Sequence, residues 1–128
     1  MTFDPGAVRQ ALADTLDGLA AAYGVKLRAI PYVPDSIDPP FAYPADMSWV
    51  VDSADDTVTA TVAIRILTSS AEDRAGQEHL DVLIPAATAA LDAVSAYSVD
   101  SGTGYDVFPV GPDGDEFYGA ELEVRVLA

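Results

Sequence analysis

The side chains that could carry chemistry in this chain are few, and their spacing does not match a catalytic site. His79 is the single histidine, and no serine or cysteine nucleophile accompanies it in a recognisable motif. A general base needs a positioned partner, so we expect His79 to have a structural or surface role. We therefore predict no catalytic residue, no cofactor-binding residue and no enzymatic activity.

Acidic residues in two turns come nearest to a metal site. They are Asp113 with Asp115, and the aspartates of residues 52–56. Neither set fits the twelve-residue calcium loop, which needs ligands at fixed steps and a closing glutamate. Zinc is not suggested either, because the chain has no cysteine and one histidine. Gly102-x-Gly104 lacks the lysine of a phosphate-binding loop, so we predict turns without metal or cofactor.

A charged stripe runs along the helix predicted after residue 69. Arg74, Glu78 and Asp81 occupy positions i, i+4 and i+7, which lie on one helix face. Two interpretations remain open. The stripe is either solvated, with one intrahelical ion pair, or part of a contact between subunits, because each arginine of so acidic a chain has many acidic partners to choose from.

A proline-rich segment, residues 31–44, carries apolar side chains without helix or strand periodicity. These side chains are Tyr32, Ile37, Phe41 and Tyr43. Exposed apolar side chains in a stiff loop often mark a partner surface, and prolines limit the entropy lost on docking. We predict that these four residues, together with Arg74 and Glu78, contact a neighbouring subunit or another protein of an assembly.

The elements that position these residues are organised around residues 57–83. Residues 57–67 alternate between apolar and polar side chains, which indicates a half-buried strand. Residues 69–83 change to helical spacing, and Ser69 with Glu72 fits a capping box. Pro85 removes one helical hydrogen bond, so we expect a break there and a second short helix after it.

The remaining predicted elements lie on both sides of this unit. Asp4 and Pro5 fit the start of an amphipathic helix. A turn at Asp113-Gly114 indicates an antiparallel hairpin. The ranges that we predict are a helix at 5–23, a strand at 25–30, edge-strand residues 42–43 ended by Pro44, a strand at 49–51, a polar loop at 98–104, and hairpin strands at 105–110 and 117–127.

This order predicts one α+β domain over residues 1–128. We expect a mixed or antiparallel β-sheet of about four to five strands, with two to three helices packed on one face. Half of the residues are hydrophobic, so a core is expected despite the net charge of -15. The predicted core residues are Val62, Ile64, Leu122 and Val124 of the sheet and Leu12, Leu16 and Leu80 of the helices.

The acidic charge excludes some partners. Twenty-one acidic residues against six basic ones form a surface that repels nucleic acid and anionic membranes, so DNA binding through phosphates is not expected. The charge either provides solubility or lines a surface that DNA passes without sticking. We find no basic-then-apolar leader at the start and no apolar run near the ~20 residues that span a bilayer.

The last feature is a set of short segments that follow one another over most of the chain. They are Arg9-Gln10-Ala11-Leu12, Tyr32-Val33-Pro34-Asp35 with Pro39-Pro40, residues 73–81, Ala90-Leu91, and residues 118–124. In this order the chain resembles the tail terminator (tail completion) proteins of long-tailed phages that infect actinobacteria. Pro85 departs from the resemblance, because a glycine or serine turn is expected there.

The resemblance implies a small α+β subunit that forms a homo-oligomeric ring, expected to be hexameric, at the head-proximal end of the tail tube. The ring would stop polymerisation of the tail tube protein and join the tail to the head-tail connector protein. DNA would pass through the lumen without specific binding, and no membrane would be involved. The implied location is the virion neck, after assembly in the host cytoplasm. A closed ring uses two different patches on each subunit.

Other classes of protein remain as alternatives. A head-to-tail connector or stopper protein has a similar size and also forms rings. An acidic DNA-mimic inhibitor would act as a monomer or dimer on a nucleic-acid enzyme, and a small enzyme is the remaining alternative. Particle mass separates ring proteins from the other two classes, and position in the virion separates a terminator from a connector.

Overall fold

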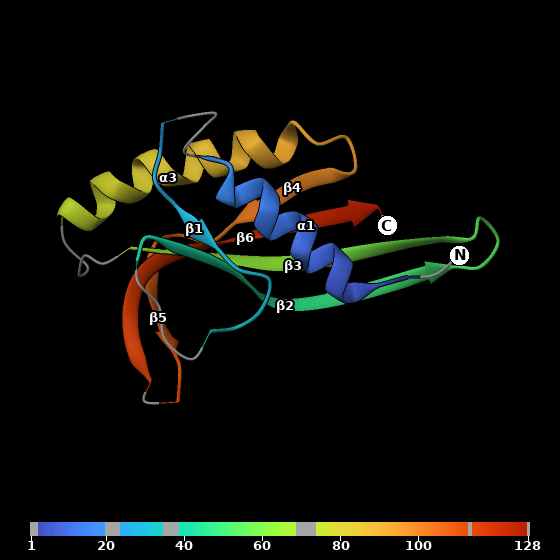
Figure 1. The fold of residues 1–128 in the computed structure, drawn as a ribbon, viewed down its shortest axis with the longest axis horizontal. Coiled ribbons are helices and arrows are strands. Elements are labelled where there is room, and N and C mark those ends of the chain that lie inside the picture. Colours follow the sequence, from blue (N-terminus) through green and yellow to red (C-terminus); the bar gives the residue numbers. More distant parts are fainter. Residues whose placement is uncertain (1–2, 20–23, 35–38, 69–73, 113, 128) are drawn as a thin grey trace.

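The computed structural model describes residues 3–19, 24–34, 39–68, 74–112 and 114–127, which form an α+β fold (Figure 1). This composition confirms the predicted fold class, although the sheet holds six strands rather than four to five. Neither described helix has the length and apolarity needed to cross a membrane. The elements are α1 (Pro5–Asp17), β1 (Arg28–Ala29), β2 (Phe41–Asp52), β3 (Thr57–Thr68), α3 (Arg74–Asp92), β4 (Tyr97–Gly102), β5 (Asp106–Val110) and β6 (Asp115–Leu127).

The six strands form one mixed sheet in the order β1-β2-β3-β6-β4, with β5 also beside β6. The short β1–β2 pair is parallel, and the other pairs are antiparallel. β6 pairs with β3 along one side and with β5 and then β4 along the other. The C-terminal strand therefore holds three other strands in place.

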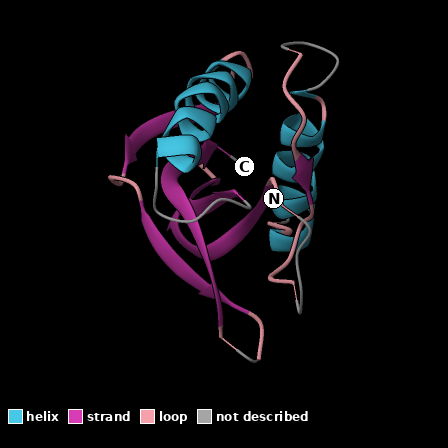
Figure 2. Ribbon diagram, turned by 90° about the vertical axis from the view of Figure 1, so that its left-hand side faces the viewer, coloured by secondary structure: helices cyan, strands magenta, loops and turns pink. Residues whose placement is uncertain are grey.

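The predicted centre of the fold is confirmed. Val62 lies opposite Val124 and Ile64 opposite Leu122, and all four are buried. The alternation of residues 57–67 therefore does put one set of side chains into the core. α1 and α3 pack on that same face of the sheet (Figure 2). The helix residues that the sequence assigns to the core, Leu12, Leu16 and Leu80, are buried as well.

α1 begins as predicted and ends earlier. The carboxylate of Asp4 accepts a hydrogen bond from Ala7 N at 3.1 Å, and Pro5 follows at the first helical position. The helix ends at Asp17 rather than Tyr23, and residues 20–23 lie outside the described residues. The strand predicted at 25–30 is reduced to Arg28–Ala29.

Pro85 does not break the second helix, so that prediction is wrong. α3 runs from Arg74 to Asp92 with Pro85 inside it. The ring of Pro85 is exposed, while Leu83 and Ala87 on either side are buried against the sheet. Burial of both halves offsets the one hydrogen bond that the proline removes. The predicted capping box of Ser69 and Glu72 lies outside the described residues.

Two strand predictions also need correction. Residues 41–52 form a single long strand, β2, which passes through Pro44 and changes register between Pro44 and Asp46. No described strand pairs with the other side of β2 at Pro44, so its missing N–H removes no ladder bond. Residues 98–104, predicted as a loop, largely belong to β4, an edge strand of which the side chains of Tyr97 and Val99 pack on the core.

The hairpin of β5 and β6 is confirmed. Gly111 and Gly114 have positive φ angles of 82° and 68°, and Gly114 N donates to Gly111 O at 3.1 Å. Glycine adopts such angles without steric cost. Beyond the turn, Gly119 of β6 lies so close to β3 that a Cβ atom there would fall 2.2 Å from Ile66 O. The backbone of β3 leaves no room for a residue other than glycine at this position.

Candidate functional site

The proline-rich segment that the sequence marks as a partner surface is divided by the fold. Tyr32 is 63% exposed, as predicted. Phe41 and Tyr43 are only 2% and 1% exposed, so the prediction that they form an exposed surface is wrong. Both belong to β2 and pack with Leu67 and Val110 in a second small core. Ile37 lies outside the described residues.

Tyr43 owes part of its position to Arg65, a residue that sequence reasoning did not single out. Arg65 Nε donates to Glu121 Oε2 at 3.0 Å and Arg65 Nη1 donates to Tyr43 Oη at 3.5 Å. Its guanidinium also lies 4.9 Å from the ring centre of Phe108. Burial lowers the pKa of Arg65, but the hydrogen bonds to Tyr43 and Glu121 outweigh it and raise the pKa. Arg65 and its contacts with Tyr43, Glu121 and Phe108 therefore lie beside the second core, on the face of the sheet without helices.

The charged stripe on α3 separates into two kinds of contact. Arg74 pairs with Glu78 within the helix at 2.9 Å, and their side chains are 91% and 64% exposed. Asp81 instead accepts a hydrogen bond from Tyr105 Oη at 2.7 Å. Burial and this hydrogen bond to Asp81 raise the pKa of Tyr105 to about 12. The bond ties α3 to the segment that enters β5.

A more prominent surface lies on β2, where the sequence predicts only a short strand. We call residues 48–60 the arm, because this distal part of the β2–β3 hairpin extends beyond the helices (Figure 1). Trp49, Val50 and Val51 of the arm are 51%, 72% and 62% exposed. Three neighbouring large apolar side chains in water are unusual for an isolated subunit and typical of a contact surface.

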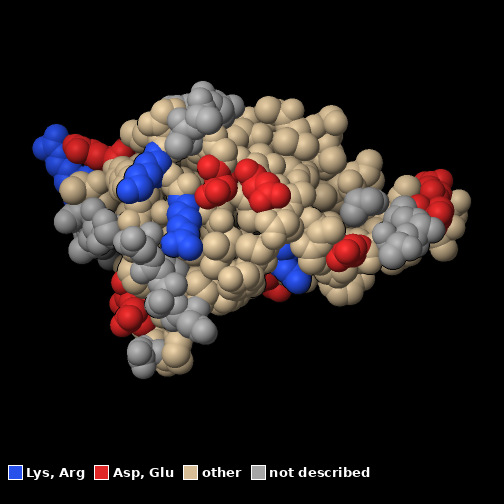
Figure 3. All heavy atoms as spheres, in the orientation of Figure 1, with Lys and Arg blue, Asp and Glu red and all other residues tan. Residues whose placement is uncertain are grey.

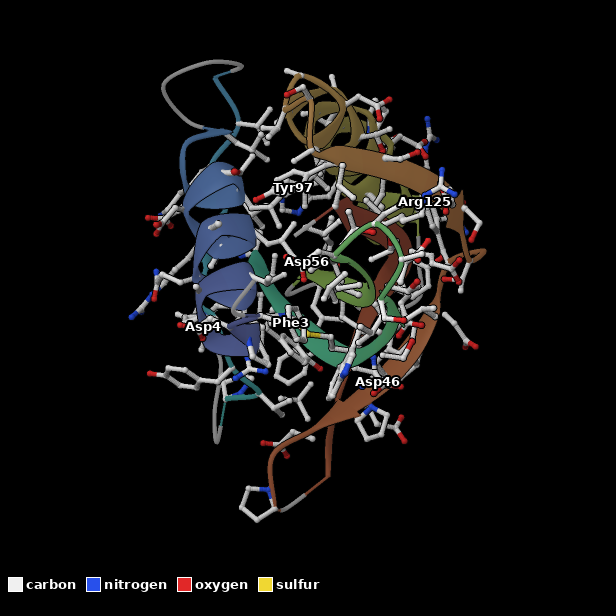
Figure 4. The ribbon with its side chains drawn as sticks, turned by 90° about the vertical axis from the view of Figure 1, so that its right-hand side faces the viewer. Phe3, Asp4, Asp46, Asp56, Tyr97 and Arg125 are labelled. Carbon is white, nitrogen blue, oxygen red and sulfur yellow. The ribbon has the colours of Figure 1, made fainter. Side chains whose placement is uncertain are left out.

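Both faces of the arm carry an exposed apolar side chain. Trp49 and Val51 lie opposite Ala60 and Val58, so they share the helix side of the sheet, while Val50 lies opposite Thr59 on the other side. Phe3 covers part of Trp49, with ring centres 5.3 Å apart. Figure 4 looks onto this end of the molecule, with Phe3 beside β2 and Asp56 at the tip.

A groove of about 340 Å³ runs along β2 at the base of the arm. Apolar side chains form most of its wall, and Arg9 and Asp46 supply charge. The lining residues come from α1, from the segment after β1, and from β2: Arg9, Tyr32, Val33, Pro44, Ala45, Asp46, Met47 and Trp49. The groove connects Tyr32, the predicted surface residue, with Trp49 of the arm.

Charge is distributed unevenly over this surface. The arm carries Asp52, Asp55 and Asp56 and no basic residue. Figure 3 shows acidic side chains and no basic ones at the end of the molecule formed by the β2–β3 turn. Of the six basic residues, Arg65, Arg74 and Arg125 pair with acids. The other three, Arg9, Lys26 and Arg28, form no ion pair with another described residue.

The described residues offer little arrangement for chemistry. His79 is half-buried on α3. No group of three or more histidine, cysteine or acidic side chains within the described ranges lies close enough to hold a metal ion. Tyr97 borders a second groove, of about 380 Å³, and its pKa is raised mainly by burial. The features that stand out are the arm, its groove and the separation of charge.

These features have to be interpreted from the molecule itself. Sequence reasoning found Tyr32 and the acidic turn but missed Trp49, Val50 and Val51, which resemble any apolar strand until their lack of cover is seen. Comparison with known proteins adds no assignment, because the chain matches no family model and no curated protein sequence.

Proposed function

We propose that this protein is a structural subunit of a phage virion, a tail terminator that assembles into a ring at the head-proximal end of the tail tube. The ring, with six subunits as the expected number, stops polymerisation of the tube protein and joins the tail to the head-tail connector. DNA passes through its lumen. This proposal rests on the resemblance of the ordered sequence segments and on the surface described above.

The exposed apolar arm is the observation that carries the proposal. Trp49, Val50 and Val51 keep large apolar side chains in water, so a partner that covers them would stabilise the protein by removing that surface from solvent. A ring built from one kind of subunit needs two different patches, one for each neighbour. The acidic arm and the basic residues near β1 are two such patches.

The acidic surplus supports the same role. Fixed negative charge does not hold phosphates, so a ring with a net charge of -15 on each subunit lets duplex DNA slide instead of binding it. A DNA-mimic inhibitor also carries acidic charge, but its role gives no reason for an apolar arm. A connector or stopper protein shares both the charge and the need for contacts, and it remains the second candidate.

Particle mass and location test the proposal. Mass photometry and negative-stain electron microscopy of the purified chain should show closed rings with a mass several times that of the 13.4 kDa subunit. Depletion of the protein from infected cells should yield tails of irregular length. Rings combined with normal tails that fail to attach to heads would favour the connector. A particle that stays monomeric at all concentrations, alone and with tail tubes, would refute the ring.

A further inference from the structure

Hydrogen bonds at the borders of the sheet show which border is left open. In four edge positions an aspartate carboxylate accepts a hydrogen bond from a strand N–H. The pairs are Asp17 with Ala29 of β1 at 3.2 Å, Asp46 with Met47 of β2 at 2.9 Å, Asp92 with Val99 of β4 at 3.4 Å, and Asp106 with Val107 of β5 at 2.8 Å. An occupied N–H cannot pair with a strand from another molecule, so these bonds oppose strand pairing at those positions.

The arm lacks this protection. Ile30 N donates to Ala42 O at 3.2 Å, so the backbone groups of Ala42 point toward β1 and away from β3. Alternate residues of a strand point the same way. The register shift after Pro44 carries this outward set on to Met47, Trp49 and Val51. Asp46 occupies the N–H of Met47, whereas Trp49 and Val51 donate to no acceptor within the described ranges.

Open backbone groups and exposed apolar side chains therefore coincide at Trp49 and Val51. The turn next to them carries Asp52, Asp55 and Asp56. The opposite charge lies at β1, where Lys26 and Arg28 outnumber the one acidic lining residue, Asp17, in a smaller groove of about 210 Å³ that Leu27, Pro39 and Pro40 complete. The tip of the arm and β1 are well separated in the molecule, so the two surfaces of one copy do not meet each other (Figure 1).

We propose that the arm of one copy of this chain docks at the β1 groove of a second copy. The acidic turn lies against Lys26 and Arg28, and Val51 contacts the apolar part of the groove. A second copy is the favoured occupant because the chain supplies both signs of charge on different surfaces, and its exposed Arg74 and Arg125 already pair with acids. This inference rests on the proposed function, because a contact between two different surfaces of the same chain is heterologous and such contacts can close a ring.

Charge reversal tests the contact. The arm variant D52N/S53K/D55K changes the turn from three negative charges to one net positive charge. Asparagine keeps an oxygen for the bonds that Asp52 accepts from Ala54 N and Asp55 N. The groove variant K26E/R28E reverses the opposite patch. We expect each variant alone to remain monomeric under conditions in which the unmodified chain forms rings, and we expect unchanged circular dichroism and thermal melting.

Mixing the two variants is the decisive step. Among copies of the groove variant, the unmodified acidic arm faces a groove that is now acidic as well. In the mixture, that arm can dock on the unmodified basic groove of the arm variant. In the mixture the reversed arm also meets the reversed groove, so every contact joins opposite charges and alternating rings of normal mass should return. The control D115K/E116K, which makes the same charge change on the β5–β6 hairpin, should form rings without a partner.

Each outcome has a definite consequence. Rings from either variant alone, or no recovery in the mixture of two folded variants, would overturn the docking of the arm on β1 while leaving the ring itself intact. An unmodified chain that forms no ring would instead refute the proposed function and, with it, this contact. Loss of rings in D115K/E116K would show that general charge, not the arm, controls assembly and would also overturn the inference.

Discussion

The strands β2 and β3 are paired along eleven register positions, yet their apolar side chains differ in exposure. In β3 every second side chain is buried under the helices, including Val62, Ile64 and Ile66. In β2 the side chains of Trp49, Val50 and Val51 are as apolar but remain exposed. For Trp49 and Val51 the difference comes from what covers the sheet, since α1 and α3 end short of the arm (Figure 1), and Val50 lies on the face without helices. An apolar sequence shows which side chains can be buried, and the helices that pack on the sheet determine whether those side chains are buried.

The largest expected effect of a single change lies in the centre. Ile64→Ala should lower the free energy of unfolding by about 2–5 kcal/mol, because it leaves a cavity among fully buried side chains. Val50→Ala in the arm should change it by less than about 0.5 kcal/mol. Urea unfolding of both variants measures the difference, and similar losses at the two sites would contradict the contrast between core and arm.

A second change examines how closely the central ladder is packed. Gly119→Ala would place a Cβ atom 2.2 Å from Ile66 O and 2.6 Å from Leu67 Cδ2, so β6 must shift, at a cost of about 1–3 kcal/mol. Gly104→Ala is the matched control, because no atom lies within 4 Å of its added carbon. Thermal melting of the two variants should differ clearly. Equal melting temperatures would mean that β6 can move away from β3 without loss of stability.

The coupling energy of an ion pair near the centre of the sheet should be larger than that of an exposed pair at the periphery. A double-mutant cycle on Arg65 and Glu121, which are about 30% exposed, should give a coupling energy on the order of 1 kcal/mol. The cycle on Arg74 and Glu78 should give about 0.3–0.5 kcal/mol, since both side chains are open to water. Guanidinium is unsuitable for this measurement because it screens charge, so urea is used. A stronger Arg74–Glu78 coupling would reverse the ranking.

The last effect depends on pH and is expected at Tyr105, which anchors the periphery through Asp81. The raised pKa means that the folded state favours the neutral phenol, so its contribution is complete below pH 10 and is lost between pH 10 and about 12. Tyr105→Phe should cost about 0.5–1 kcal/mol at pH 7 and should weaken the loss of stability across that pH window. Urea unfolding at pH 8, 10 and 11 checks the slope, and identical slopes would argue against the bond.

Much of the fold follows from local pattern. The alternation of residues 57–67, the helix start at Asp4 and Pro5, and the β5–β6 hairpin were predictable because period, caps and turn residues agree there. Pro44 and Pro85 misled the prediction for one physical reason. Each lies where the surrounding structure tolerates a missing N–H, on an open strand edge and in a helix held by burial on both sides.

The candidate surface was less predictable than the fold. Tyr32 was correctly expected to be exposed, but Phe41 and Tyr43 fill the second core. The exposure of Trp49 and Val51 depends on where the helices end, and that of Val50 on the lack of cover on the other face. The protection of the edges depends on pairs such as Asp17 with Ala29, which no local spacing reveals. In so acidic a chain, some aspartates have a specific task in the backbone hydrogen-bond network.

The position of β6 also sets the order in which the chain can fold while it is being synthesised. β3, β4 and β5 all pair with β6, so the sheet cannot close before synthesis has passed Leu127. Until then the apolar faces of α1, α3 and β3 lack the cover that Leu122, Val124 and Val126 of β6 supply. We therefore expect the growing chain to stay open until β6 has been made, and its high negative charge to keep neighbouring nascent copies apart in that time.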